Sequence, residues 1–348
     1  MQPIHSIQVL RALAAFMVAI HHVQPDAAIV ADRAGLSFAR SDLLPWMAGV
    51  DIFFVVSGFI MVHASQDLFG RDDASRLFLK RRLARIVPLY WAMTTLFLLV
   101  GLAVPAALNS GAPNFQQILG SYLFWPVVST QGMVQPVYSL GWTLNYEMLF
   151  YVLFAVGLML PRRWTLPAIA FVLALLVGVE SLKGPLGLPF GFWGQPIVLE
   201  FAAGMGIAVL RQKGLRLHGA LRIAVAAAGA ALLVAAAQIP GADGAWSSVL
   251  WRGSAAALLM LAAGCGREGI VPLPPVKALA AVGDASYALY LVHPFVIRGM
   301  REVLLRIGLH APMLYVGFAL AGSVIAALLL YRFFEKPATR VVRRWIGG

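Results

Sequence analysis

The chain has 348 residues, of which 60% are hydrophobic and 12% are charged, and its mean hydropathy is +0.81. A soluble domain contains about 25% charged residues, so this composition excludes an ordinary water-soluble protein and indicates a membrane protein. Lys and Arg number 27 against 15 Asp and Glu, which gives a net charge of +12. The single cysteine, Cys265, excludes a disulfide framework and a Cys-rich metal site, and we predict no bound metal.

Ten stretches of the sequence are candidate transmembrane helices. A helix needs about 20 mostly apolar residues to cross the hydrocarbon core of a bilayer. The sequence therefore predicts an all-α, polytopic membrane protein that forms one transmembrane domain over residues 1–348. The predicted spans are 7–23, 46–65, 86–104, 138–160, 165–179, 195–210, 221–239, 248–265, 279–303 and 311–333.

The distribution of Lys and Arg predicts the orientation of these spans. If both termini are cytoplasmic, the inner segments contain 19 basic residues and the outer side contains seven. Cytoplasmic loops of membrane proteins carry such an excess of positive charge. We therefore expect cytoplasmic termini, and the net charge indicates topology and an anionic ligand inside, with no need for nucleic acid. The inner segments are 66–85, 161–164, 211–222, 266–278 and 331–348.

The first span carries three side chains that a bilayer disfavours: Arg11, His21 and His22. An ionisable group at membrane depth costs about 2.5–3.5 kcal/mol, which favours a functional role. Eleven residues of helix return to within about 20° of the same face, so Arg11 and His22 share a face, about 16 Å apart, while His21 points about 80° away. The alternative is that Arg11 reaches the inner headgroups and that His22 lies at the outer interface.

Further titratable residues fall at one depth in four later spans. Asp51, Glu147, Glu200 and His293 each lie in the outer half of their predicted helix, as His22 does. Singly, each residue is explained by a hydrogen bond between packed helices. As a set at one level, they predict a polar cavity that opens outward.

A basic run stands at the inner end of the third span. It contains Arg81, Arg82 and Arg85, and Arg82 and Arg85 share a helix face because they are three residues apart. Paired guanidinium groups bind phosphate well because each planar fork donates in two directions. Such a run also marks topology or binds anionic lipid. Taken alone, the run favours these roles over the binding of a phosphate ligand.

In this order along the chain, these residues and their neighbours resemble acyltransferase family 3, the bacterial membrane O-acyltransferases. Two segments, Ile7–Ala15 and Gly49–Phe54, are most similar to the exopolysaccharide-production members. The resemblance extends over nearly the whole chain. The matching features are the spacing from Arg11 to His22, Phe53–Phe59, Arg82-x-x-Arg85 with Pro88 and Tyr90, Trp142–Tyr151, Glu200–Met205, Ser286–Pro294 and Glu335–Pro337.

The resemblance implies ten helices in the bacterial inner membrane, cytoplasmic termini, an acyl-CoA donor and no permanently bound cofactor. It assigns a catalytic role to His22 and donor binding to Arg11 and the Arg82/Arg85 pair, with Arg81 beside them. His293, Tyr90 and Trp142 belong to the shared motifs and are candidates for binding the acceptor, a glycan or glycoside. Acetyl is the expected acyl group.

The expected mechanism places the CoA phosphates at Arg82 and Arg85, and the pantetheine arm rises past Arg11 to bring the thioester near His22. His22 acts as general base on a sugar hydroxyl, because imidazole suits proton transfer near neutral pH. Glu147 or Asp51 orients the imidazole. Acylation of His22 itself, followed by transfer, is equally compatible with the sequence.

Two other classes of protein are alternatives. Intramembrane His, Asp and Glu residues suit a proton relay in a transporter that flips a lipid-linked glycan. The sequence shows no inverted repeat and no matching pair of broken helices, which transporters often have. A non-catalytic scaffold of an export machine is the second alternative, but it leaves the titratable residues without a role.

Overall fold

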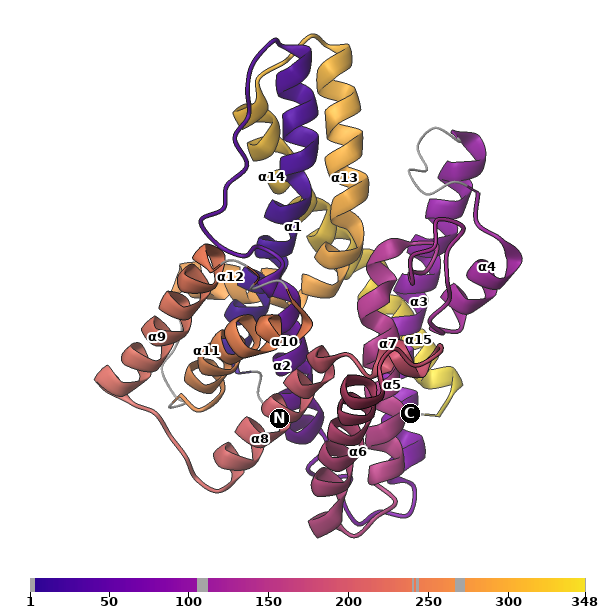
Figure 1. Ribbon diagram of the computed structural model, residues 1–348, viewed down its shortest axis with the longest axis vertical. Helices are drawn as coiled ribbons and strands as arrows, with labels where there is room; N and C mark the ends of the chain where they lie inside the picture. Colours follow the sequence, from indigo (N-terminus) through magenta and orange to yellow (C-terminus); the bar gives the residue numbers. More distant parts are fainter. Residues whose placement is uncertain (1–3, 105–111, 240, 242–243, 267–272, 348) are drawn as a thin grey trace. The chain divides into compact units, whose positions relative to one another are not determined.

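The computed structural model describes residues 4–104, 112–239, 241, 244–266 and 273–347 (Figure 1). Regular structure in these residues is helical, with isolated β-bridges but no β-strand. The all-α prediction is therefore confirmed. The helices form two compact groups. The first helical group comprises residues 1–60 and 203–333, and the second comprises residues 61–202 and 334–348.

In the first helical group, the long helix α1 packs against α12, α13 and α14 (Figure 1). Helix α9 packs against α11 in the same group. The helices that belong wholly to this group are α1 (His5–Arg33), α9 (Gly219–Gln238), α10 (Ala245–Ser248), the π-helical turn η4 (Val249–Gly253), α11 (Ser254–Gly264), α12 (Pro274–Asp284), α13 (Ser286–Arg306) and α14 (Pro312–Leu330).

In the second helical group, α3 packs against α5 and against the C-terminal helix α15, and α5 packs against α6. Its helices are α3 (Ala74–Ala103), α4 (Phe115–Tyr122), η2 (Ser139–Gly141), α5 (Trp142–Gly157), α6 (Arg162–Lys183), α7 (Phe190–Trp193), η3 (Pro196–Val198) and α15 (Lys336–Trp345). Helices α2 (Ala48–Ala64) and α8 (Leu199–Gln212) and the π-helical turn η5 (Tyr331–Glu335) contribute residues to both groups.

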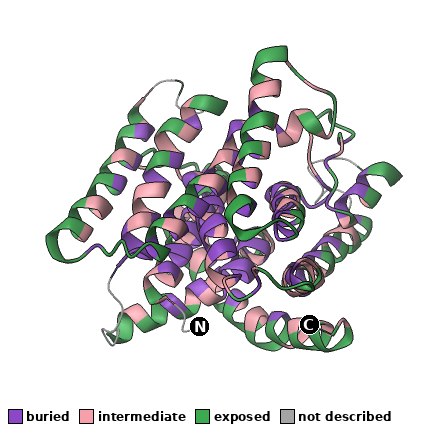
Figure 2. Ribbon diagram, turned by 90° about the horizontal axis from the view of Figure 1, so that it is seen from below, coloured by how far each residue is buried: buried purple, intermediate pink, exposed green. Residues whose placement is uncertain are grey.

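Six helices among the described residues are long and apolar enough to cross a membrane, or seven if the bent pair α12 and α13 forms one span. Many helices have one buried and one exposed face (Figure 2). Large apolar side chains stand on exposed faces, for example Phe171 at 66%, Ile223 at 70% and Met313 at 71% exposure. Exposed apolar surface of this kind suits contact with lipid. The chain is therefore a multi-pass membrane protein.

Each of the ten predicted spans coincides with helical structure, but several predicted ends are wrong. The span at 7–23 continues to Arg33, because Val23, Ala27 and Val30 pack into a buried cluster with residues of α13 and α14. The basic run before residue 86 also belongs to its span, since α3 begins at Ala74. The predicted inner segment 266–278 lies partly outside the described residues.

The predicted span 279–303 is not one straight helix. The chain bends by 75° between α12 and α13. The bend allows α12 to pack closely against the start of α1: a Cβ on Gly283 would lie 1.9 Å from the carbonyl oxygen of Gln8. Only glycine permits this approach.

Candidate functional site

Two histidines of the first helical group lie side by side. His22 on α1 and His293 on α13 have ring centroids 5.0 Å apart, with a tilt of 55° between the ring planes. His293 is completely buried, whereas His22 is half-buried. His21 is exposed and meets the edge of the His22 ring. The structure therefore brings together two of the residues singled out in the sequence, the His22–His293 pair.

Backbone carbonyls determine which nitrogen of each ring carries a proton. Nδ1 of His22 lies 2.8 Å from the carbonyl oxygen of Val18, and Nδ1 of His293 lies 3.0 Å from that of Leu289. A carbonyl oxygen only accepts, so each neutral ring donates through Nδ1–H and keeps a lone pair on Nε2. In the described part of the chain, Nε2 of His293 has no hydrogen-bond partner. This pair can accept a proton or a hydroxyl hydrogen bond.

Asp51 lies in the same helical group, on α2, and is 1% exposed. Its Oδ1 is 3.5 Å from Nε of Arg252 in the π-helical turn η4. A buried carboxylate requires such compensation. The sequence analysis did not predict the pairing of Asp51 with Arg252. The carbonyl oxygen of Val18 accepts the hydrogen bond that orients the His22 ring through Nδ1. An orienting role of Asp51 or Glu147 therefore stays a prediction.

Arg11 is also in the first helical group, and its side chain is 7% exposed. Its guanidinium donates to Oε1 of Gln8 at 2.8 Å. Both Arg11 and His22 lie on α1, as expected. Gln8 precedes Arg11 by three residues on α1. This hydrogen bond therefore draws the guanidinium of Arg11 toward the start of the helix, away from His22.

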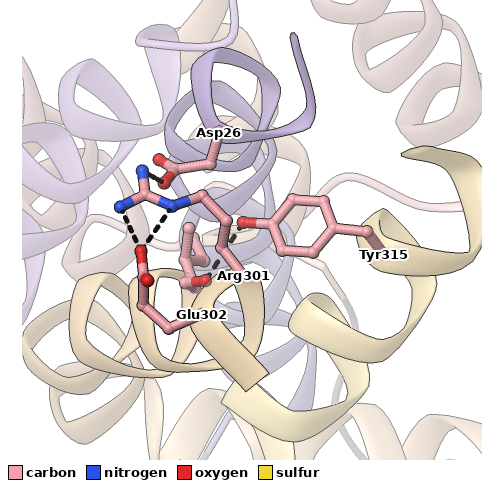
Figure 3. A network of polar contacts seen from close by, with 5 residues as sticks. Asp26, Arg301, Glu302 and Tyr315 are labelled. Carbon is pink, nitrogen blue, oxygen red and sulfur yellow. Dashed lines mark hydrogen bonds and ion pairs between the residues drawn. The ribbon is translucent and has the colours of Figure 1, made fainter. Parts of the chain in front are cut away.

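A polar network lies one turn beyond His22 on α1 (Figure 3). Arg301 of α13 donates to Oδ1 of Asp26 at 2.5 Å and to Oε1 of Glu302 at 2.8 Å. The Tyr315 hydroxyl of α14 donates to the carbonyl oxygen of Ile297 at 3.1 Å. These contacts join α1, α13 and α14 next to the His22–His293 pair, and the sequence did not predict them.

The predicted donor residues Arg81, Arg82 and Arg85 lie on α3 in the second helical group, and each is half-buried. Arg82 lies over the Phe78 ring, with Cζ 5.5 Å from the centroid. Among the described residues, Nε of Arg82 is buried without a hydrogen-bond partner. The C-terminal helix adds Arg343, whose charge interacts with those of Arg81 and Arg85. We call these four residues the arginine cluster.

Glu147 on α5 belongs to the same group and accepts a short hydrogen bond from the Tyr151 hydroxyl. Its charge also interacts with that of Arg82. Glu200, at the start of α8, is 2% exposed. Glu147 and Glu200 are thus in the second helical group, whereas His22, Asp51 and His293 are in the first. Their predicted convergence on one cavity stays a prediction.

Tyr90 and Trp142, the predicted acceptor residues of the second helical group, take part in aromatic packing. Tyr90 is completely buried, and its ring centroid lies 4.8 Å from that of Phe124. A Cβ on Gly141 would lie 2.4 Å from the Tyr90 hydroxyl, so glycine is required at this approach. Trp142 meets the edge of the Tyr146 ring, at 5.9 Å between centroids.

Comparison with known proteins gives the family. The chain matches the model of the acyltransferase domain of family 3 over residues 4–332. It is 36% identical to the exopolysaccharide production protein ExoZ of Rhizobium meliloti (strain 1021), over 84% of this chain and 89% of that protein. It is 26% identical to the acyltransferase MdmB of Streptomyces mycarofaciens, over 97% of this chain and 92% of that protein. No solved structure matches. The resemblance of the motifs is therefore confirmed, and the chain belongs to acyltransferase family 3 as a membrane acyltransferase.

Proposed function

We propose that this protein transfers an acetyl group from cytoplasmic acetyl-CoA to a sugar hydroxyl of an exported polysaccharide, in the bacterial inner membrane. The family supplies the acyl transfer. The relative ExoZ is named for exopolysaccharide production, which supports a polysaccharide acceptor. The whole chain of residues 1–348 acts as one catalytic domain.

The observation that carries the proposal is the contact between Nδ1 of His22 and the carbonyl oxygen of Val18. The hydrogen bond from Nδ1 to Val18 leaves a basic Nε2 on a half-buried side chain. Such a nitrogen can take the proton of an attacking hydroxyl. His293 offers a second Nε2 lone pair beside it, with no partner among the described residues. His293 accepts a hydrogen bond from the acceptor sugar and thereby helps to position it, while His22 removes the proton.

The arginine cluster supports the donor side of the proposal. Among the described residues, Nε of Arg82 is buried without a hydrogen-bond partner, so this guanidinium is available to an anionic ligand. Guanidinium groups bind phosphate oxygens through paired, charge-assisted hydrogen bonds. In this proposal Arg81, Arg82 and Arg85 bind the phosphates of CoA. The pantetheine arm passes beside Arg11. The thioester then reaches His22.

Reconstitution tests the reaction itself. Purified protein in detergent is given acetyl-CoA with a labelled acetyl group and deacetylated exopolysaccharide, and mass spectrometry measures acetyl on the sugar. We expect free CoA and acetylated sugar in equal amounts. If the protein consumes no acetyl-CoA but flips a lipid-linked glycan in proteoliposomes, the transporter interpretation is correct.

The proposed topology has ten membrane crossings with both termini in the cytoplasm. Six long helices, the bent pair α12 and α13, and the shorter helices α2, α5 and α8 make up this number. The excess of Lys and Arg in the inner segments supports the orientation.

Reporter fusions test this topology. Fusions at Arg76 and Gly347 are expected to report the cytoplasm, and fusions at Asp32 and Gly111 the periplasm. The measurement is the activity of a reporter that works on one side of the membrane only. If the Arg76 and Asp32 fusions report the same side, the assignment of spans is wrong.

A further inference from the structure

The C-terminal helix α15 packs along α3, the helix that carries the predicted donor arginines (Figure 1). It follows the π-helical turn η5 and has ten residues, Lys336–Trp345. Nζ of Lys80 on α3 approaches the carbonyl oxygen of Gly347 at 3.5 Å, directly after α15 ends. The family match ends at residue 332, before this helix begins.

Packing on α3 places Arg343 among like charges. The charge of Arg343 interacts with those of Arg81 and Arg85, and also with that of Arg82. Like charges that lie close together repel each other and destabilise the arrangement unless an anion compensates them. Without a ligand, the guanidinium groups therefore repel one another. A multiply charged anion bound between them would relieve this repulsion.

Two carboxylates among the described residues, Asp73 and Glu147, act on the charges of the cluster. Asp73 is close enough to Arg81 for their charges to interact, but two hydrogen bonds from Arg71, at 2.8 and 2.9 Å, occupy it. These contacts lower the pKa of Asp73, so it is ionised and already paired. Glu147 accepts the hydrogen bond of Tyr151 and acts as a counter-charge on Arg82. One such carboxylate leaves the arginine cluster with a positive excess.

We propose that Arg343 is a fourth phosphate-binding residue of the donor site, supplied by α15. This inference rests on the proposed function, because it adds a residue to the proposed donor site. The ligand is a small molecule with several phosphate groups, which CoA satisfies through its pyrophosphate and its 3′-phosphate. Arg343 is exposed, so a water-soluble ligand reaches it from the aqueous side. An anionic lipid headgroup offers the same phosphate chemistry and must be distinguished by experiment.

The test compares Arg343→Ala with Arg344→Ala. Arg344 is exposed on the same turn of α15 and points about 100° away from Arg343. Isothermal titration measures CoA affinity in a neutral detergent without phospholipid. We expect Arg343→Ala to raise the Kd about tenfold, the loss of one charge-assisted contact, and Arg344→Ala to change it less than about twofold. Arg343→Lys should recover part of the affinity.

Other outcomes separate the possibilities. If wild-type protein binds CoA and Arg343→Ala binds it equally well, the inference about Arg343 is wrong while the donor proposal survives. If wild-type protein binds no CoA, both fail. A third measurement uses nanodiscs with and without phosphatidylglycerol. If Arg343→Ala changes binding of that lipid but not of CoA, the residue serves a lipid headgroup and the inference is overturned.

Discussion

The helical groups of the His22–His293 pair and of the arginine cluster differ in how far their charges are compensated. In the first helical group, which contains the two histidines, Asp51 has Arg252 and Asp26 has Arg301 as an ion-pair partner. In the second helical group, the charges of the four arginines act on one another, and Glu147 acts on Arg82 as a counter-charge. Both of these carboxylates in the first group have a cationic partner, whereas the arginines of the second group outnumber the carboxylate that acts on them.

This difference indicates two kinds of site. A site with compensated charges is organised in advance, so its helices hold two imidazoles in fixed positions for proton transfer. A site with unmatched positive charge stores repulsion that an anion relieves on binding. Substitutions should therefore affect rate in the first site and affinity in the second. The predictions below test this contrast.

The largest effect is expected at His22. We predict that His22→Ala lowers the acyl-transfer rate about 10²–10⁴-fold, as loss of a general base does. CoA affinity should stay unchanged, because the phosphates bind elsewhere. The measurements are acetyl transfer and CoA titration on the same detergent preparation.

His21→Ala is the matched control, because His21 is the neighbouring imidazole and is exposed. It should keep substantial activity. An inactive His21→Ala variant beside an active His22→Ala variant would show that the assignment is reversed. Equal losses would indicate that both rings act or that the helix is destabilised, and thermal unfolding of both variants decides between these two.

The second effect concerns affinity. Arg82→Ala and Arg85→Ala should each raise the Kd for acyl-CoA about tenfold, with the protein still folded. Arg→Lys should recover only part, since lysine keeps the charge and loses the planar fork. Raising the salt concentration should weaken CoA binding in the wild type.

Arg76→Ala is the control for this series, because Arg76 is an exposed arginine on the same helix, α3. Its effect on CoA affinity should be small. Full activity of the double variant Arg82→Ala/Arg85→Ala at low acyl-CoA concentration would return the basic run to a purely topological role.

The smallest effect is expected from the network in Figure 3. Asp26→Asn should destabilise the protein by about 1.5 kcal/mol, because Arg301 loses a charge-assisted partner that is mostly buried. Because the ion pair joins α1 to α13 one turn beyond His22, the transfer rate should fall as well. Thermal unfolding in detergent and the transfer rate are the two measurements.

Exchange of the charges sharpens this test. Asp26→Arg combined with Arg301→Asp should restore part of the stability and part of the transfer rate. Glu302→Gln is the control and should change stability by less than about 0.5 kcal/mol, since Glu302 is exposed. If Asp26→Asn is neutral in both measurements, the pair does not hold the two helices in register.

Much of the fold could be predicted from the sequence. Hydrophobic runs placed a helix at each of the ten predicted spans, because burial in lipid depends on local composition. The ends were harder. Helix α1 continues to Arg33 through Gln24, Pro25 and Asp26, since Asp26 finds a partner on α13. The bend before α13 follows from the close packing of α12 on α1, which no local pattern encodes.

The candidate site divides in the same way. Helical rotation and motif order selected His22, and His293 was among the residues expected near it. The sequence could not pair Asp51 with Arg252, or Asp26 with Arg301, since 275 residues separate the latter two. Arg343 stood in a basic C-terminal run that looked like a topology signal. An amphipathic reading of α15 would have suggested that one face packs against another helix.

The sequence by itself determined the membrane environment, the helical class and the chemistry that the polar residues can perform. Each of these depends on composition and on short-range periodicity. Tertiary structure decided which charges are compensated: it placed Arg252 against Asp51, joined His22 to His293 and added Arg343 to the arginines of α3. The physical reason is that the energy of a charge depends on its distance to every other charge, and folding sets those distances.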